Sequence, residues 1–139
     1  MAKHTLWIVT YSRGTYYTNE IKPYHWSFFI ETETQGIQRL GIAHQLRGMP
    51  GAFRYQGPEK VDLKKSQNRK EELEIGEVDD SKLDEIHNIL KEVPIDNVES
   101  SGWNCQDWAL DGMVKLQEKG FVYDFHKKED VKNWLKERA

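Results

Sequence analysis

Cys105 is the single cysteine of this 139-residue chain, and its position is typical of a reactive thiol. It opens an apolar helical stripe within residues 100–120, directly after Asn104 and two residues before Asp107. Asn104 and Asp107 resemble a capping pair that would fix the first turn of a helix. Backbone N–H groups and the helix dipole at such a position favour a thiolate. The pattern predicts a nucleophilic cysteine; the alternative is a buried cysteine that acts as a small hydrophobe.

A nucleophilic thiol needs a base within hydrogen-bond reach and a third group that orients this base. His25 and His44 each lie inside an apolar strand pattern, with His25 opening HWSFFI and His44 closing GIAH. In a hairpin, a residue near the start of one strand lies opposite a residue near the end of the next, so the two imidazoles are expected to be cross-strand neighbours. We therefore expect His25 to take the thiol proton and His44 to hold the tautomer of His25.

The remaining three histidines are expected to be idle and exposed to solvent. They are His4 near the N-terminus, His87 on the outer side of a helix and His126 in a linker. A metal site would be the competing use of His25, His44 and Cys105. Because the sequence has neither a pair of cysteines nor an HExxH motif, we expect no metal.

Runs rich in β-branched and aromatic residues predict the strands that must position these side chains. They cover residues 5–13, 24–33, 36–48 and 52–56, followed by two weaker strands around a charged loop at residues 64–72. A short polar turn separates the second run from the third, so these two are expected to form a hairpin.

Downstream of Asp79, apolar residues recur at three- and four-residue intervals, which predicts helices. The first begins near Asp79 and ends before Pro94, the second runs from Cys105 to Gly120, and the third lies within residues 127–139. Strands followed by helices predict a single α+β domain, residues 1–139, in which an antiparallel sheet packs against two or three helices.

The composition limits the classes of function. The formal net charge is −3, with acids and bases mixed along the chain, so there is no electrostatic footprint for nucleic acid. A single cysteine excludes an internal disulfide and favours a reducing compartment, so we expect a cytoplasmic protein. The apolar stretches are too short for a signal-peptide core or a membrane span, and we expect no transmembrane anchor.

The motifs HWSFFI, GIAHQL and NCQDW, in this order, resemble the circularly permuted papain-like families of thiol enzymes. The likeness is strongest to the lecithin:retinol acyltransferase and phospholipid-acyltransferase branch, and nearly as strong to the permuted deubiquitinase and deSUMOylase-like peptidases. The resemblance implies a papain-like fold with Cys105 as nucleophile, His25 as general base and His44 as the orienting group. It also implies that the backbone N–H of Cys105 belongs to an oxyanion hole.

Two departures from the acyltransferase pattern make a lipid substrate less expected. NCQDW stands where the acyltransferases have NC-E-H-F, and the chain ends in NWLKERA rather than in a hydrophobic anchor.

Together these features predict a cofactor-free thiol hydrolase or acyltransferase that works through Cys105, His25, His44 and an acyl-enzyme. Its substrate would be a small molecule or peptide with an amide, ester or thioester bond. The side chains expected to bind this substrate are Trp26, Arg47, Trp103 and Asn104. Two alternatives remain open: a non-catalytic module of the same fold that binds a ligand or peptide, and a lipid acyltransferase or phospholipase.

Overall fold

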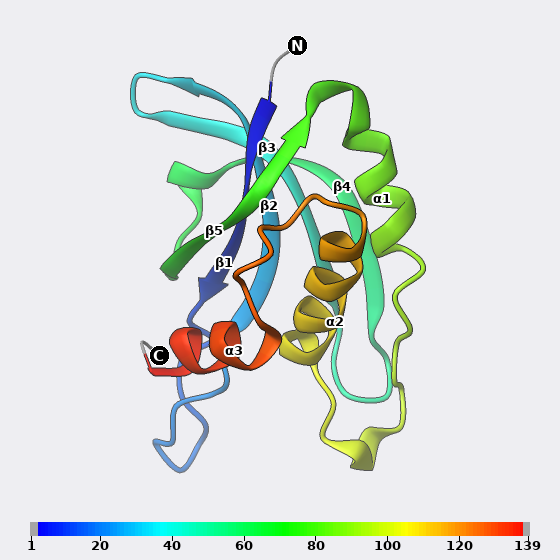
Figure 1. Ribbon diagram of the computed structural model, residues 1–139. Coiled ribbons are helices and arrows are strands. Elements are labelled where there is room, and N and C mark those ends of the chain that lie inside the picture. The colour runs from blue at the N-terminus through cyan, green and yellow to red at the C-terminus, as the bar shows by residue number, and fades with distance from the viewer. Residues whose placement is uncertain (1–2, 138–139) are drawn as a thin grey trace.

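A five-stranded antiparallel sheet forms the centre of the molecule (Figure 1). A computed structural model describes residues 3–137 of the chain. The strands are β1 (Lys3–Tyr11), β2 (His25–Gln35), β3 (Gln38–Arg47), β4 (Arg54–Asp62) and β5 (Arg69–Asp79). They lie in the order β4-β3-β2-β1-β5, so β2 is the central strand. The expected hairpin of β2 and β3 is confirmed by their antiparallel pairing.

The two faces of the sheet differ because side chains alternate along each strand. On β2, Trp26, Phe28 and Ile30 belong to the main core. Phe29 points to the other face, where it joins a small cluster with Val9 and Leu63. One face is therefore closed by a large core, and the opposite face is only partly covered.

Three helices follow the five strands and cover one face of the sheet (Figure 1). They are α1 (Leu83–Leu90), α2 (Cys105–Glu118) and α3 (Lys128–Glu137). Short 3-10 helices lie at Leu63–Lys65, Asp80–Lys82 and Glu99–Ser101. Each long helix contributes buried apolar residues to the same core as the strands, which confirms a single α+β domain.

Helix α2 packs against β2 and β3 and begins where the sequence predicts. Asn104 is its N-cap, and Asn104 and Asp107 form the expected capping box. Gly112 lies against the Phe28 ring, where an added Cβ would come within 3.0 Å of ring carbon. The small residue therefore lets α2 approach the central strand closely.

The charged region after β4 departs from the expectation. The fourth strand is longer than predicted, and β5 begins at Arg69, inside the stretch expected to be a loop. Its charges are partly matched across the sheet, because the guanidinium of Arg39 binds both Glu31 and Glu72. Tertiary pairing of this kind is absent from any local pattern, which explains the difference.

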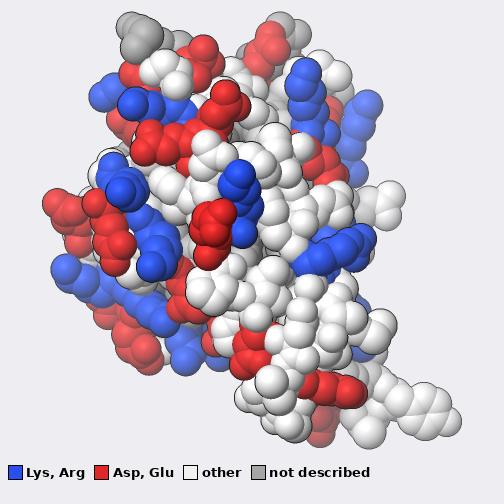
Figure 2. Space-filling model, turned by 90° about the vertical axis from the view of Figure 1, so that its right-hand side faces the viewer, with Lys and Arg blue, Asp and Glu red and all other residues white. Residues whose placement is uncertain are grey.

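The face of the molecule seen in Figure 2 agrees with the mixed charge of the sequence. On the face seen in Figure 2, acidic and basic side chains are interspersed rather than gathered into an area of one sign. Within residues 3–137, none of the helices has the length and apolar character that a membrane crossing requires.

Candidate functional site

The first turn of α2 is fixed to the start of β2. The side-chain amide of Gln106 donates a hydrogen bond of 2.8 Å to the carbonyl oxygen of Tyr24. The backbone of Trp26 hydrogen-bonds to the Sγ atom of Cys105. Cys105 and Trp26 are both buried in the main core. The cysteine therefore lies beside the backbone of the residue that follows His25.

This contact is made where β2 and β3 separate. Their pairing ends at Ser27 and Gln45, although the pairing of β2 with β1 continues to His25 and Tyr11. Tyr24 and Trp26, whose backbone groups hydrogen-bond to the first turn of α2, lie beyond the last β2–β3 pair. The end of the ladder leaves backbone groups of β2 that are not used for pairing with β3, and α2 binds to this segment.

Burial raises the pKa of the Cys105 thiol from its ordinary value. The backbone N–H groups of Trp26 and Cys105 and the positive charge of Arg13 act in the opposite direction but do not offset it. Cys105 is only 2% exposed. Its resting form at neutral pH is the thiol, not the thiolate that a helix N-terminus alone would favour.

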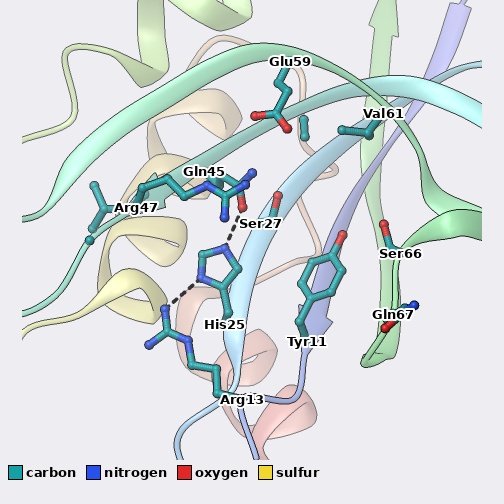
Figure 3. Close-up of a pocket in the computed structure, with 13 residues that line it drawn as sticks. Tyr11, Arg13, His25, Ser27, Gln45, Arg47, Glu59, Val61, Ser66 and Gln67 are labelled. Carbon is teal, nitrogen blue, oxygen red and sulfur yellow. Dashed lines mark hydrogen bonds between the residues drawn. The ribbon is translucent and has the colours of Figure 1, made fainter.

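His25 lies on the other face of the sheet, where Gln45 and Arg13 hold its ring (Figure 3). Its Nε2 atom is 2.7 Å from Oε1 of Gln45, and its Nδ1 atom is 3.3 Å from Nη2 of Arg13. Because a guanidinium only donates, Nδ1 must accept, so Nε2 carries the proton and donates to Gln45. The ring is therefore held in one tautomer, with its basic nitrogen directed at Arg13.

Burial lowers the pKa of His25 to about 4, and the positive charges of Arg13 and Arg47 add to this effect, while the bond to Gln45 opposes it. His25 is consequently neutral at pH 7. No hydrogen bond within residues 3–137 joins its ring to Sγ of Cys105, and the two side chains approach the start of β2 from opposite faces.

A cavity of about 480 Å³ opens beside His25 (Figure 3). It lies on the face of the sheet that the helices leave uncovered, between the ends of β1, β2 and β3 and the strand β4. Its polar lining includes Arg13, His25, Ser27, Gln45, Arg47 and Glu59. The hydroxyl of Tyr11 also reaches this cavity, and it hydrogen-bonds to Ser66.

The expectation that His44 orients His25 is wrong. His44 pairs with Phe28, not with His25, and the alternation of β3 places it on the helix-covered face. Its Nδ1 atom is 2.7 Å from the hydroxyl of Tyr55, which lies 2.9 Å from Nδ1 of His87. The turn between β2 and β3 sets a register that places His44 opposite Phe28, and the pairing ends at Ser27, before His25. Gln45, the next residue along, occupies the position expected for His44.

The environment of His44 is a closed one. Burial lowers its pKa to about 4, with a smaller contribution from the nearby His87. Its Nε2 atom is buried and has no hydrogen-bond partner among the described residues, and the same holds for the indole nitrogen of Trp108. This group of side chains belongs to the core between the sheet and α1.

The four predicted substrate-binding residues lie in different environments. Arg47 lines the cavity beside His25. Trp26 is fully buried in the core. Trp103 packs edge-on against Phe53 at 5.7 Å between ring centroids, and Asn104 caps α2. Only Arg47 is therefore placed where it could touch a ligand of this cavity.

The histidines expected to be idle are engaged. His87 takes part in the Tyr55 contact, His4 lies 2.8 Å from a carboxylate oxygen of Asp80, and His126 hydrogen-bonds to the backbone oxygen of Glu74. Each partner comes from a distant part of the sequence, so the local pattern could not reveal it.

Gln45 and Arg13 are the site residues that sequence reasoning missed. A signal for Gln45 was present, because strand alternation puts residues 25, 27 and 45 on one face once the register is known. Arg13 lies in the segment after β1, and no periodicity points to its contact with His25. Among residues 3–137, no group of three or more histidine, cysteine or acidic side chains is arranged to hold a metal ion.

Comparison with known proteins identifies a family but no activity. No curated protein and no solved structure matches the chain. Residues 6–123 match the model of a family of unknown function, DUF6540. This match covers most of β1, the other four strands, α1 and α2, and it includes both Cys105 and His25, so the chain belongs to the DUF6540 family.

Proposed function

We propose that this chain is a cysteine-dependent hydrolase or acyltransferase of permuted papain-like fold, with Cys105 as nucleophile and His25 as general base. The observation that carries this proposal is the attachment of α2 to the start of β2. It brings the only thiol of the chain, at a capped helix N-terminus, beside the residue that follows a tautomer-fixed histidine.

Gln45 takes the orienting role that the sequence had suggested for His44. A side-chain carbonyl that accepts from Nε2 leaves Nδ1 as the basic atom, which is the arrangement a general base needs. Gln45 is itself 7% exposed, so its amide is held by the surrounding sheet. The third group of this site is therefore an amide and carries no charge.

The resting site is a neutral pair. Burial keeps Cys105 protonated, and His25 is uncharged at pH 7. Arg13 affects both groups, since it donates to Nδ1 of His25 and its charge acts on Cys105. Proton transfer from Sγ to Nδ1 thus requires Arg13 to move away from the ring and His25 to turn toward the thiol.

The reaction would proceed through a thioester. The Sγ proton passes to Nδ1 as Sγ bonds to the carbonyl carbon, and the N–H group of Cys105 stabilises the oxyanion. The bond from this carbon to its nitrogen, oxygen or sulfur leaving atom breaks, and the imidazolium returns the proton to that atom. Water or an amine then attacks the thioester and gives up a proton through Nδ1 to Sγ as the C–S bond breaks.

The test is to look for the acyl-enzyme directly. Purified protein is mixed with p-nitrophenyl acetate, and intact-protein and peptide mass spectrometry locate the acetyl group. We expect an adduct on Cys105 in the native chain, none in Cys105→Ala, and much slower formation in His25→Ala.

His4→Ala provides the matched control, because it removes an imidazole that contacts Asp80 at the other end of β1. Its acylation rate should equal that of the native chain. Acetylation that occurs only on lysines, or at Cys105 with the same rate in His25→Ala, would contradict the proposal.

A ligand-binding module of the same fold is the second candidate. The observation in its favour is that His25 lines the cavity and Cys105 does not. In that case Cys105 would stay unacylated and alkylate with iodoacetamide only as fast as a buried thiol, at every pH up to its raised pKa. A lipid acyltransferase would instead require detergent or liposomes for acylation of Cys105.

A further inference from the structure

We propose that the cavity beside His25 binds a monoanionic ligand, through Arg13 and Arg47, and that the acyl donor carries a carboxylate that occupies this position. Only the identification of the ligand as the acyl donor rests on the proposed function. The anion site itself follows from the side chains of the cavity.

The two guanidinium groups are the first observation. Arg13 and Arg47 line the same cavity, and Figure 3 places their side chains on either side of His25. Neither takes part in an ion pair within the described chain, whereas Arg39 binds two carboxylates. Two guanidinium groups that converge on one cavity without carboxylate partners form a site suited to a carboxylate, because their fork geometry matches it.

The charges that line the cavity favour a ligand with a single negative charge. Among the described residues, Glu59 is the only acidic side chain in the lining, and it accepts a hydrogen bond from the side-chain amide of Gln56. His25 is neutral, so two positive charges and one negative charge leave a net charge of +1. A single carboxylate balances this charge, whereas a phosphate dianion would exceed it.

Binding of a carboxylate would also act on the base. In the resting state an N–H group of Arg13 occupies Nδ1 of His25, the atom that must accept the thiol proton. A carboxylate competes for that guanidinium and forms a stronger, charge-assisted hydrogen bond with it. An anionic ligand thus frees Nδ1, and a neutral ligand leaves Arg13 where it is. Arg13 therefore determines both the preference for an anionic ligand and the activation of His25.

The direct test is a binding titration in the Cys105→Ala variant, which lacks the proposed nucleophile. Glutaramate, which has a single carboxylate, is titrated into the ¹⁵N-labelled protein, with glutaramide as the uncharged analogue, and amide shifts of residues 11–13, 25–27 and 45–48 are followed. We expect saturable shifts with glutaramate only, and binding weakened roughly tenfold in Arg47→Gln and in Arg13→Gln.

Arg54→Gln is the matched control. Arg54 pairs with Arg47 across β3 and β4 but does not line the cavity, so removing it deletes the same charge nearby. Glutaramate affinity should change by less than about twofold in this variant, because exposed charges interact weakly through water. An equal loss in Arg54→Gln and Arg47→Gln, or equal binding of glutaramide, overturns the proposal.

A kinetic comparison separates this inference from the proposed function. Acylation of Cys105 by p-nitrophenyl hemiglutarate is compared with acylation by p-nitrophenyl valerate, in which a methyl group replaces the carboxyl group. We expect at least tenfold faster acylation by the hemiglutarate, with the preference lost in Arg13→Gln. Equal rates would refute the anion site and leave the thiol enzyme standing. Glutaramate binding without any acylation would refute the enzyme and leave the anion site standing.

Discussion

His25 and His44 occupy opposite faces of one sheet, and the comparison of their surroundings separates a candidate reactive site from a structural one. The pKa of each histidine is lowered to about 4, chiefly by burial. His25 borders an open cavity with two arginines, and both of its ring nitrogens have partners. His44 is 1% exposed and belongs to a chain of hydrogen bonds through Tyr55 to His87. A lowered pKa alone therefore does not identify a reactive histidine.

The difference between the two histidines arises from one residue step in β3. His44 and Gln45 are adjacent in the chain and point to opposite faces. His44 thus joins the core, while Gln45 reaches His25. Two adjacent polar residues in a strand point to opposite faces of the sheet. Only the pairing register determines which of the two reaches the site.

The largest expected difference between the two histidines is in acylation of Cys105. His25→Gln should slow acylation by p-nitrophenyl acetate by about 10²–10⁴-fold, the usual contribution of a general base. His44→Gln should leave the rate within about threefold, because it keeps a hydrogen-bonding side chain on the far face. Rates are measured by stopped-flow release of p-nitrophenolate. A larger effect for His44→Gln would reverse the roles assigned to the two residues.

Stability should show the opposite order. His44→Ala removes a fully buried ring and leaves the hydroxyl of Tyr55 with one partner fewer, so we expect a loss of roughly 2–4 kcal/mol in the free energy of unfolding. His25 borders the cavity, so His25→Ala should lower the free energy of unfolding by less than about 1 kcal/mol. Urea denaturation followed by tryptophan fluorescence measures both values. Equal losses would show that the His25 region is as closed as the core around His44.

Substitutions of Gln45 test the contact between β3 and the proposed base, His25. Gln45→Met keeps the length of the side chain but removes the acceptor for Nε2, so acylation should slow by roughly tenfold, about the value of one hydrogen bond. Gln45→Glu should instead raise the pKa of His25 above its value of about 4, because a carboxylate stabilises the imidazolium. NMR titration of the imidazole resonances reads out this shift. No change at His25 in either variant would contradict the contact.

The smallest expected effect is on the pH dependence of stability. Well above pH 6.5, His25 and His44 are neutral in both the folded and the unfolded chain and do not contribute to the pH dependence. Between pH 6.5 and about 4, the unfolded chain binds a proton that the folded chain excludes, so stability falls as the pH falls. Each histidine should contribute a slope of at most ~1.4 kcal/mol per pH unit in this window.

Single variants separate these two contributions. His44→Gln and His25→Gln should each remove about half of the slope between pH 6 and 5, as measured by urea denaturation at several pH values. A slope that neither variant changes would mean that other groups cause the acid sensitivity.

Many elements of the fold could be predicted from local patterns. The capped start of α2 is an example, because Asn104 and Asp107 act on backbone groups within one turn. The β2–β3 hairpin was also predictable from its two apolar runs and the polar turn between them. The candidate nucleophile and base were chosen in the same way, from the residues next to these local signals, and their roles remain a prediction.

The parts of the site that could not be predicted depend on contacts between distant residues. Arg13 meets His25 across a loop, and Gln106 meets Tyr24 from the far end of the chain. The burial of Cys105 depends on how α2 lies on the sheet, and this burial reverses the direction of the thiol pKa expected from a helix N-terminus alone. None of these contacts can be predicted from a short stretch of sequence.

By itself the sequence determined which side chains are available and which local elements carry them, because capping, alternation and helical periodicity act over a few residues. The tertiary structure alone decided which of these side chains meet. The register of β3 turned His44 inward and Gln45 toward His25, and the end of the β2–β3 ladder admitted α2. The physical reason is that pairing register and burial are properties of the whole sheet, and a shift of one residue exchanges its two faces.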